Sequence, residues 1–198
     1  MCEAPGCLRE SWNAYRAGAS FLKMKGVARP QQTFETFRET PENKESFEAM
    51  KALATGKSNF FLLLIYGGVG NGKTHLANAM TIFLNEHGQD CRYFIVADLM
   101  SSLRGTIAKG ESVDDLINTI RDFSALILDD YKPDLGTAFE QDVVEQIINH
   151  RYAFMLPTVL ITNADWKSLP ERIVSRFSEP GVGKVILNGA SDYRAGAT

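Results

Sequence analysis

An apolar run that passes directly into a glycine-rich loop restricts the fold of this chain more than any other feature. The run covers residues 60–66, and the loop Gly67–Thr74 reads Gly-Gly-Val-Gly-Asn-Gly-Lys-Thr. This loop fits the pattern G-x-x-x-x-G-K-[S/T], whose glycines let backbone N–H groups turn inward around an anion. Apolar spacing over residues 76–84 predicts a helix that ends near Gly88. Strand, loop and helix in this order predict a phosphate-binding loop in an α/β fold.

The loop has the form of a Walker A motif, and each position has an expected role. We expect Lys73 to contact the β- and γ-phosphates of a nucleotide and Thr74 to ligate Mg²⁺. A flexible glycine loop beside a core strand is the alternative, but the flanking strand and helix favour the nucleotide site. The predicted nucleotide-binding residues are Gly67, Gly68, Val69, Gly70, Asn71, Gly72, Lys73, Thr74 and His75.

Composition predicts a soluble, cytoplasmic protein with one main domain. The chain has 198 residues, of which 44% are hydrophobic, which is enough for a continuous core. A net charge of -3 argues against electrostatic coating of nucleic acid, so any contact with a single strand must be local. Three cysteines suit a reducing compartment. The longest apolar run, residues 60–66, is too short to span a membrane, and no signal-peptide pattern precedes it.

Residues 1–27 are predicted to form an N-terminal helical segment, and residues 28–198 the main domain. The segment carries an apolar stripe at helical spacing, formed by Leu8, Trp12, Tyr15, Ala19 and Leu22. Packing on the main domain and docking of a partner protein are equally open roles for this stripe. Cys2 and Cys7 are close enough to suggest a zinc site, but such a site needs two more ligands, which favours free thiols.

Two aromatic residues lie upstream of the apolar run. Phe34 and Phe37 precede a turn at Pro41 and a helix predicted over residues 42–53. We expect these rings to pack in the core and to contact an adenine ring in part.

A second chemical feature is the apolar run at residues 125–128, which leads into Asp129 and Asp130. Ligands of open α/β sheets bind beyond the carboxyl ends of the strands, so Asp129 would lie beside the glycine loop and hold Mg²⁺ through water. Asp130 could orient the attacking water as a general base. Aspartates are also common in turns, but an independent phosphate loop in the same chain favours the catalytic interpretation.

Polar residues also follow the apolar run at residues 158–161. Asn163 is placed to polarise a water molecule or contact the γ-phosphate, although it could also cap the following turn. The predicted helix at residues 169–177 carries Arg172 and Arg176 on one face. Such a pair is usually solvated or salt-bridged, but it could reach the γ-phosphate on a neighbouring subunit as arginine fingers.

Further elements complete an alternating pattern. Strands are predicted at residues 92–96 and 184–187, and helices at 97–109, 112–123 and 138–152. The motif order, with Walker A at Gly67–Thr74, Walker B at 126–130, sensor I at 162–163 and an arginine-finger box at 172–177, resembles that of the AAA+ ATPases.

Within that superfamily the chain resembles the DnaC/DnaI-type bacterial helicase loaders and the related IstB-type transposition ATPases, over about residues 28–194. The strings that carry the resemblance are Thr33-Phe-Glu-Thr-Phe37, Asp129-Asp130, Ile148-Asn-His-Arg-Tyr152, Pro157-Thr158, Glu171-Arg-Ile-Val-Ser-Arg176 and Asp192-Tyr-Arg194. The chain departs from the family in placing Tyr131-Lys-Pro-Asp between the Walker B acids and a Leu-Gly pair.

The resemblance implies a three-layer α/β/α P-loop fold with a five-stranded parallel sheet in the order 5-1-4-3-2. It also implies binding of ATP and Mg²⁺ at a subunit junction, slow hydrolysis to ADP and phosphate, and self-association. The implied task is to place the replicative helicase on single-stranded DNA. The alternatives are a transposition helper ATPase, a small-molecule kinase, and a module that binds ATP without hydrolysing it.

Individual roles follow from the same resemblance. Lys73 and Thr74 are implied to contact nucleotide and Mg²⁺, Asp129 is the implied metal carboxylate and Asp130 the base. Asn163 corresponds to the sensor, Arg176 to a finger acting in trans, and Arg194 to a sensor II arginine. Residues 97–123 resemble an extra helical element beside DNA, in which Arg104 and Lys109 are either phosphate contacts or solvated side chains.

Overall fold

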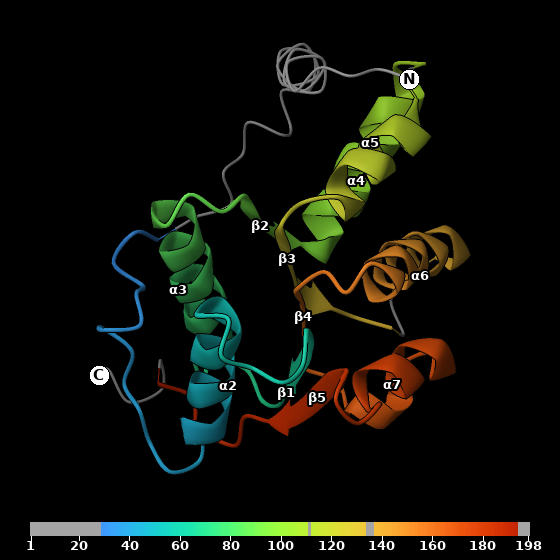
Figure 1. Cartoon of the computed structure of the whole chain (residues 1–198). Helices are drawn as coiled ribbons and strands as arrows, with labels where there is room; N and C mark the ends of the chain where they lie inside the picture. The colour runs from blue at the N-terminus through green and yellow to red at the C-terminus, as the bar shows by residue number, and fades with distance from the viewer. Residues whose placement is uncertain (1–28, 111, 134–136, 194–198) are drawn as a thin grey trace.

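A five-stranded parallel sheet forms the centre of the molecule in the computed structural model, which describes residues 29–110, 112–133 and 137–193 (Figure 1). The strands are β1 (Leu62–Tyr66), β2 (Cys91–Ile95), β3 (Ala125–Tyr131), β4 (Thr158–Thr162) and β5 (Gly183–Leu187). They lie in the order β2-β3-β4-β1-β5, which confirms the predicted order 5-1-4-3-2. Because β1 and β4 are buried on both faces, they read as continuous apolar runs in the sequence.

Helices cover both faces of the sheet. One face holds α2 (Lys44–Ala54) and α3 (Lys73–Glu86), whose side chains pack on one apolar cluster. The opposite face holds α4 (Val96–Ala108), α5 (Val113–Arg121), α6 (Ala138–Ala153) and α7 (Glu171–Phe177), which pack on a second cluster (Figure 1). A short 3₁₀ turn, η2 (Trp166–Ser168), precedes α7. The predicted three-layer α/β/α architecture is therefore confirmed.

The register of the strands brings the motif residues to one edge of the sheet. Tyr66, the last residue of β1, lies opposite Thr162 of β4 and Leu187 of β5. Ile95 of β2 lies opposite Asp129 of β3. The residues after β1 and β4 therefore leave the sheet side by side, as parallel pairing requires.

The structure differs from the predicted elements mainly at the end of β3. The sequence pattern predicted a strand over 125–128 followed by Asp129 and Asp130, whereas β3 continues to Tyr131. The pairing of β3 with β4 shifts between Leu128 and Tyr131, so the two aspartates lie at a bulge within the strand. A bulge changes the direction in which side chains leave the strand. The simple alternation expected for a strand does not reveal a bulge.

Several predictions fall on residues that the structure does not describe. The N-terminal helical segment, with Cys2 and Cys7, and the sensor II assignment of Arg194 lie outside the described residues. Across 29–110, 112–133 and 137–193, no helix is both long and apolar enough to cross a membrane.

Candidate nucleotide-binding site

The glycine loop joins β1 to α3 and adopts a backbone that only its glycines permit easily. Gly67, Gly70 and Gly72 have φ values of 138°, 72° and 95°. A Cβ at Gly67 would lie 2.3 Å from the carbonyl oxygen of Asn188, which is backbone and cannot swing aside. The helix α3 begins immediately after Gly72, at Lys73, so its free N–H groups face the loop. The predicted strand, loop and helix are thus present in the required order.

Lys73 folds back over the loop. Its Nζ donates to the carbonyl oxygens of Gly67 and Gly68 at 2.8 and 2.5 Å, and to Asn71 Oδ1 at 2.9 Å. Burial lowers the pKa of Lys73 to about 8, while the negative charges of Asp129 and Asp130 act in the opposite direction. The ammonium is therefore held at the loop by carbonyl groups that a phosphate can replace as partners.

Thr74 and Asp129, the two predicted magnesium ligands, contact each other directly. Thr74 Oγ1 donates to Asp129 Oδ2 at 2.9 Å, although the residues are 55 positions apart in the chain. Asp129 is 4% exposed. Mg²⁺ prefers hard oxygen ligands and is bound by one or two protein carboxylates together with substrate phosphates, so this donor set fits the ion. Residues that the structure describes include no group of three or more His, Cys, Asp and Glu side chains suited to a metal ion on its own.

Tyr93 of β2 is a member of this site that the sequence pattern did not reveal. Its hydroxyl donates to Asp129 Oδ2 at 2.8 Å, and the backbone N–H of Asp130 donates to Asp129 Oδ1 at 2.8 Å. Burial is the main cause that raises the pKa of Tyr93, and the charge of Asp129 adds to it. The hydroxyl therefore remains a donor at neutral pH. Tyr93 read as an ordinary core position because only the fold places it beside Asp129.

Asp130, the predicted base, lies next to Asn163, the predicted sensor. Asn163 Nδ2 donates to Asp130 Oδ1 at 3.2 Å. Lys132 Nζ lies 2.8 Å from Asp130 Oδ2, an ion pair that the sequence analysis did not anticipate. Asp130 has a φ of 56°, in a region that non-glycine residues seldom occupy. Such conformations concentrate at functional sites, so this outlier supports a special role for Asp130.

The arginines on α7 contact α6 instead of the glycine loop. Arg172 Nη1 lies 3.6 Å from Glu145 Oε2, and the Arg172 side chain is 74% exposed. The guanidinium carbon of Arg176 lies 5.1 Å from the centre of the Tyr152 ring. The structure thus brings Lys73, Thr74, Asp129, Asp130 and Asn163 to one edge of the sheet and leaves both arginines apart from them. An arginine that acts in trans would have this placement, but the trans role stays a prediction.

The aromatic residues upstream of β1 pack beside the loop. Phe34 is 6% exposed and belongs to the core, as predicted. Phe37 stacks on Phe47 with ring centres 5.4 Å apart, and its ring is nearly perpendicular to that of His75, with ring centres 5.2 Å apart. His75 Nε2 donates to the carbonyl oxygen of Thr33 at 2.8 Å. These rings form an apolar wall next to α3, and adenine contact by Phe37 stays a prediction.

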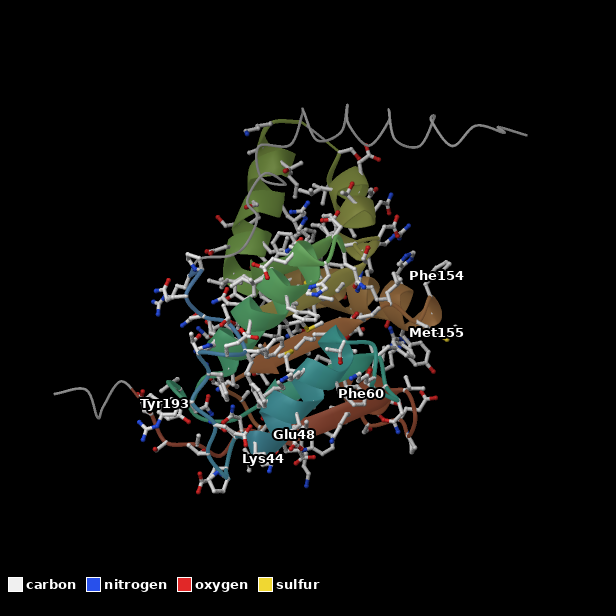
Figure 2. The ribbon with its side chains drawn as sticks, turned by 60° about the vertical axis from the view of Figure 1, so that its left-hand side comes forward. Lys44, Glu48, Phe60, Phe154, Met155 and Tyr193 are labelled. Atoms are coloured by element: carbon white, nitrogen blue, oxygen red, sulfur yellow. The ribbon has the colours of Figure 1, made fainter. Side chains whose placement is uncertain are left out.

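A segment after β5 also crosses the loop. The backbone N–H of Tyr193 donates to the carbonyl oxygen of Gly70 at 3.1 Å, and the Tyr193 hydroxyl accepts from Asn43 Nδ2 at 2.6 Å. A Cβ at Gly70 would lie only 1.8 Å from Asp192 Oδ1. Figure 2 shows Tyr193 at one side of the molecule and the exposed Phe154 and Met155 at the opposite side. Asp192-Tyr-Arg194 therefore starts at the site, although Arg194 itself is not described.

The helical pair α4 and α5 carries the two predicted DNA contacts. Arg104 Nη1 lies 2.5 Å from Glu140 Oε1, which also links α4 to the start of α6. Glu140 Oε2 in turn accepts from the backbone N–H of Thr137 in a capping box. Lys109 is exposed at the end of α4. Arg104 therefore has an intramolecular partner, and contact of either residue with DNA stays a prediction.

Together, the parallel sheet order, the glycine loop and the paired aspartates define a P-loop nucleotide-binding domain of the AAA+ type. Residues 28–181 match the family described as the bacterial DnaA ATPase domain, and the chain belongs to this family. Its resemblance to AAA+ helicase loaders, inferred from the motifs, is confirmed by the relatives below.

Relatives include replication initiators and helicase loaders. The chain is 28% identical to the replicative helicase loader DnaC of Escherichia coli (strain K12), a match that covers 84% of this chain and 70% of DnaC. It is 29% identical to the chromosomal replication initiator DnaA of Flavobacterium psychrophilum, over 81% of this chain and 35% of that protein. The chain thus spans about a third of the initiator's length.

Solved structures show the same fold. A structure of the initiator DnaA bound to AMPPCP and single-stranded DNA aligns with a TM-score of 0.72 and 25% identity, over 80% of this chain and 50% of that one. A structure of the DnaC helicase loader aligns with a TM-score of 0.66 and 20% identity, over 80% of this chain and 97% of that one.

Proposed function

We propose that this chain binds ATP with Mg²⁺ and hydrolyses it to ADP and phosphate at a junction between two of its own subunits. The observation that carries the proposal is the 2.9 Å hydrogen bond from Thr74 Oγ1 to Asp129 Oδ2. This bond places Thr74, at the end of the Walker A motif, beside Asp129 of the Walker B motif. Both side chains supply oxygen atoms that could bind Mg²⁺ next to the phosphate loop. Membership of an ATPase-domain family supports the same activity.

Each residue has a role that follows from its position. The loop N–H groups and Lys73 bind the phosphates, and Lys73 exchanges its carbonyl partners for phosphate oxygens. Thr74 and Asp129 would hold Mg²⁺, which neutralises the charge that develops on the phosphates. Asn163 orients the attacking water, and Asp130 accepts its proton. Arg176 of one subunit reaches the γ-phosphate bound by the next subunit.

The proposed task is to help place the replicative helicase on single-stranded DNA. Support comes from the match to the helicase loader DnaC, which extends over most of both chains. A second candidate is a module that binds ATP without turnover. It is favoured by the pairing of Asp130 with Lys132 at 2.8 Å, because an ammonium on the carboxylate opposes its action as a base.

ATP binding is tested by the variant Lys73→Ala in a filter-binding assay, with Lys44→Ala as a matched control. Lys44 lies on α2 with its side chain 57% exposed, so its removal should leave ATP affinity unchanged. We expect Lys73→Ala to abolish binding, and normal binding by that variant would exclude the phosphate site.

The client is tested by co-purification with the host replicative helicase, with and without ATP. Capture that depends on ATP and is lost in Lys73→Ala supports the loader function. Equal capture by wild type and Lys73→Ala would contradict a nucleotide-controlled loader.

A further inference from the structure

Arg176 rests on an aromatic ring contributed by α6. Its guanidinium carbon lies 5.1 Å from the centre of the Tyr152 ring, within the range of an attractive cation–π contact. Its Nη1 also donates to the backbone oxygen of Arg172 at 3.3 Å. The Arg176 Nε is buried and has no hydrogen-bond partner in the described part of the chain. The ring contact therefore supplies much of what fixes this side chain.

Tyr152 is itself fixed on two sides. Its hydroxyl donates to Glu179 Oε2 at 2.8 Å, and its ring lies 6.5 Å from that of Phe61. The hydrogen bond to the Glu179 carboxylate is the main cause that raises the pKa of Tyr152, so the ring stays uncharged over the neutral range. Glu179 follows the end of α7, two residues after Phe177. The ring thus connects α6 to the end of the helix that carries Arg176.

Arg172, four residues earlier, is held much more loosely. Its side chain is 74% exposed, and its ion partner Glu145 is 3.6 Å away. Exposed ion pairs of this kind contribute little orientation because both side chains remain free to rotate. Of the two arginines on α7, Arg176 is therefore the one with a defined direction.

We propose that Tyr152 is a positioning residue that holds Arg176 in the direction from which it reaches the γ-phosphate of a neighbouring subunit, with Glu179 fixing the ring; this inference rests on the proposed function. A long arginine side chain samples many rotamers, and the ring reduces that number before the subunits meet. Holding Arg176 in one orientation should raise the rate of ATP turnover, because only a correctly oriented guanidinium stabilises the transition state.

The test compares Tyr152→Leu, Tyr152→Phe and Phe61→Leu in the assembled full chain, with ATP turnover and ATP affinity both measured. We expect Tyr152→Leu to lower turnover by about 2- to 30-fold with unchanged ATP affinity, from the range for cation–π contacts. Tyr152→Phe keeps the ring and should retain most activity. Phe61→Leu keeps an apolar side chain against the Tyr152 ring and leaves the hydrogen bond to Glu179 and the contact with Arg176 in place, so turnover should stay near the wild-type value.

Mixing experiments separate a positioning role from a structural one. A Lys73→Ala subunit cannot bind ATP but supplies an intact finger, so adding it to Tyr152→Leu should restore turnover at the junctions where the two meet. Glu179→Ala, which frees the Tyr152 hydroxyl, should show a smaller defect that Lys73→Ala also rescues, and it serves if Tyr152→Leu does not fold. Absence of rescue for both variants, or equal defects in Tyr152→Leu and Phe61→Leu, would overturn the inference.

Arg176→Ala distinguishes failure of the inference from failure of the proposed function. If Arg176→Ala turns over ATP normally when assembled, the finger itself is wrong. If Arg176→Ala is defective and rescued by Lys73→Ala while Tyr152→Leu behaves as wild type, only the positioning role is wrong.

Discussion

The hydroxyl of Tyr93 offers a direct test of how the Asp129 carboxylate is held. Tyr93 is 6% exposed and Asp129 is 4% exposed, so the hydrogen bond between them is shielded from water. Tyr93→Phe removes one oxygen atom and preserves the shape of the ring. Asp129 Oδ2 then keeps only the hydroxyl of Thr74, which the proposed mechanism assigns to Mg²⁺. The variant therefore leaves a buried carboxylate short of a donor.

The expected loss follows from the strength of hydrogen bonds to charged groups. Such bonds contribute about 1.5–3 kcal/mol, so Tyr93→Phe should lower the free energy of unfolding by that amount. For a chain of this size, each kcal/mol corresponds to roughly 2–4 °C in Tm, which predicts a decrease of about 3–12 °C. Urea unfolding followed by circular dichroism measures the free energy, and a thermal scan measures Tm.

Tyr131→Phe is the matched control. Tyr131 is 3% exposed, and its hydroxyl is buried with no hydrogen-bond partner among the described residues. Removing an unsatisfied hydroxyl should be neutral or stabilising. Equal losses in the two variants would refute the reasoning, because they would show that the ring environment and not the bond to Asp129 sets the effect.

Three further predictions concern other parts of the site and its support. Arg151 is fully buried and its guanidinium donates four hydrogen bonds to neutral oxygens, so Arg151→Met leaves four acceptors short of a donor. The variant should lower the free energy of unfolding by roughly 3–5 kcal/mol in urea titration, and a loss below about 1 kcal/mol would contradict this. Gly70→Ala should lower Tm more than Gly88→Ala, since both have positive φ but only Gly70 faces the Asp192 carboxylate, and equal shifts would show that this contact is unimportant. Burial lowers the pKa of Lys73 to about 8, and a bound phosphate should raise it. ATP affinity should therefore be constant below about pH 8 and should fall by up to about tenfold per pH unit above it. Titration calorimetry that shows no such decline would exclude this role of the Lys73 charge.

Local sequence patterns predicted the parts of the site that lie within a single motif, namely the glycine loop and the strand that ends near Asp129. The loop at 67–74 needs glycines for its own backbone, and an apolar run before Asp129 indicates a strand end without any knowledge of its neighbours. The order of the strands came from the resemblance, because spacing along one chain does not state which strands pair. The roles of Asp130 as base and Asn163 as sensor came from the same resemblance.

Contacts between motifs could not be predicted in this way. In the sequence, Tyr93 has the pattern of any core residue of β2. Its hydrogen-bond partner, Asp129, lies 36 positions later in the chain, on β3. Arg151 stood on a helix that reads as amphipathic, yet its guanidinium caps carbonyl groups at the starts of two strands. A periodic pattern reports that a side chain is buried but not which polar group it meets.

The two aspartates of β3 show why the departure from the family pattern after them matters. Asp129 is bonded on the inward side, to Thr74 and Tyr93, whereas Asp130 is held by Asn163 and by Lys132. The bulge that turns Asp130 to a φ of 56° also brings Lys132, a residue of the inserted string, within 2.8 Å of it. For Asp130 to accept a proton in the proposed reaction, this ammonium must first leave the carboxylate. As long as the ammonium stays in place, Asp130 is a weaker base, so this ion pair would slow hydrolysis even after ATP has bound.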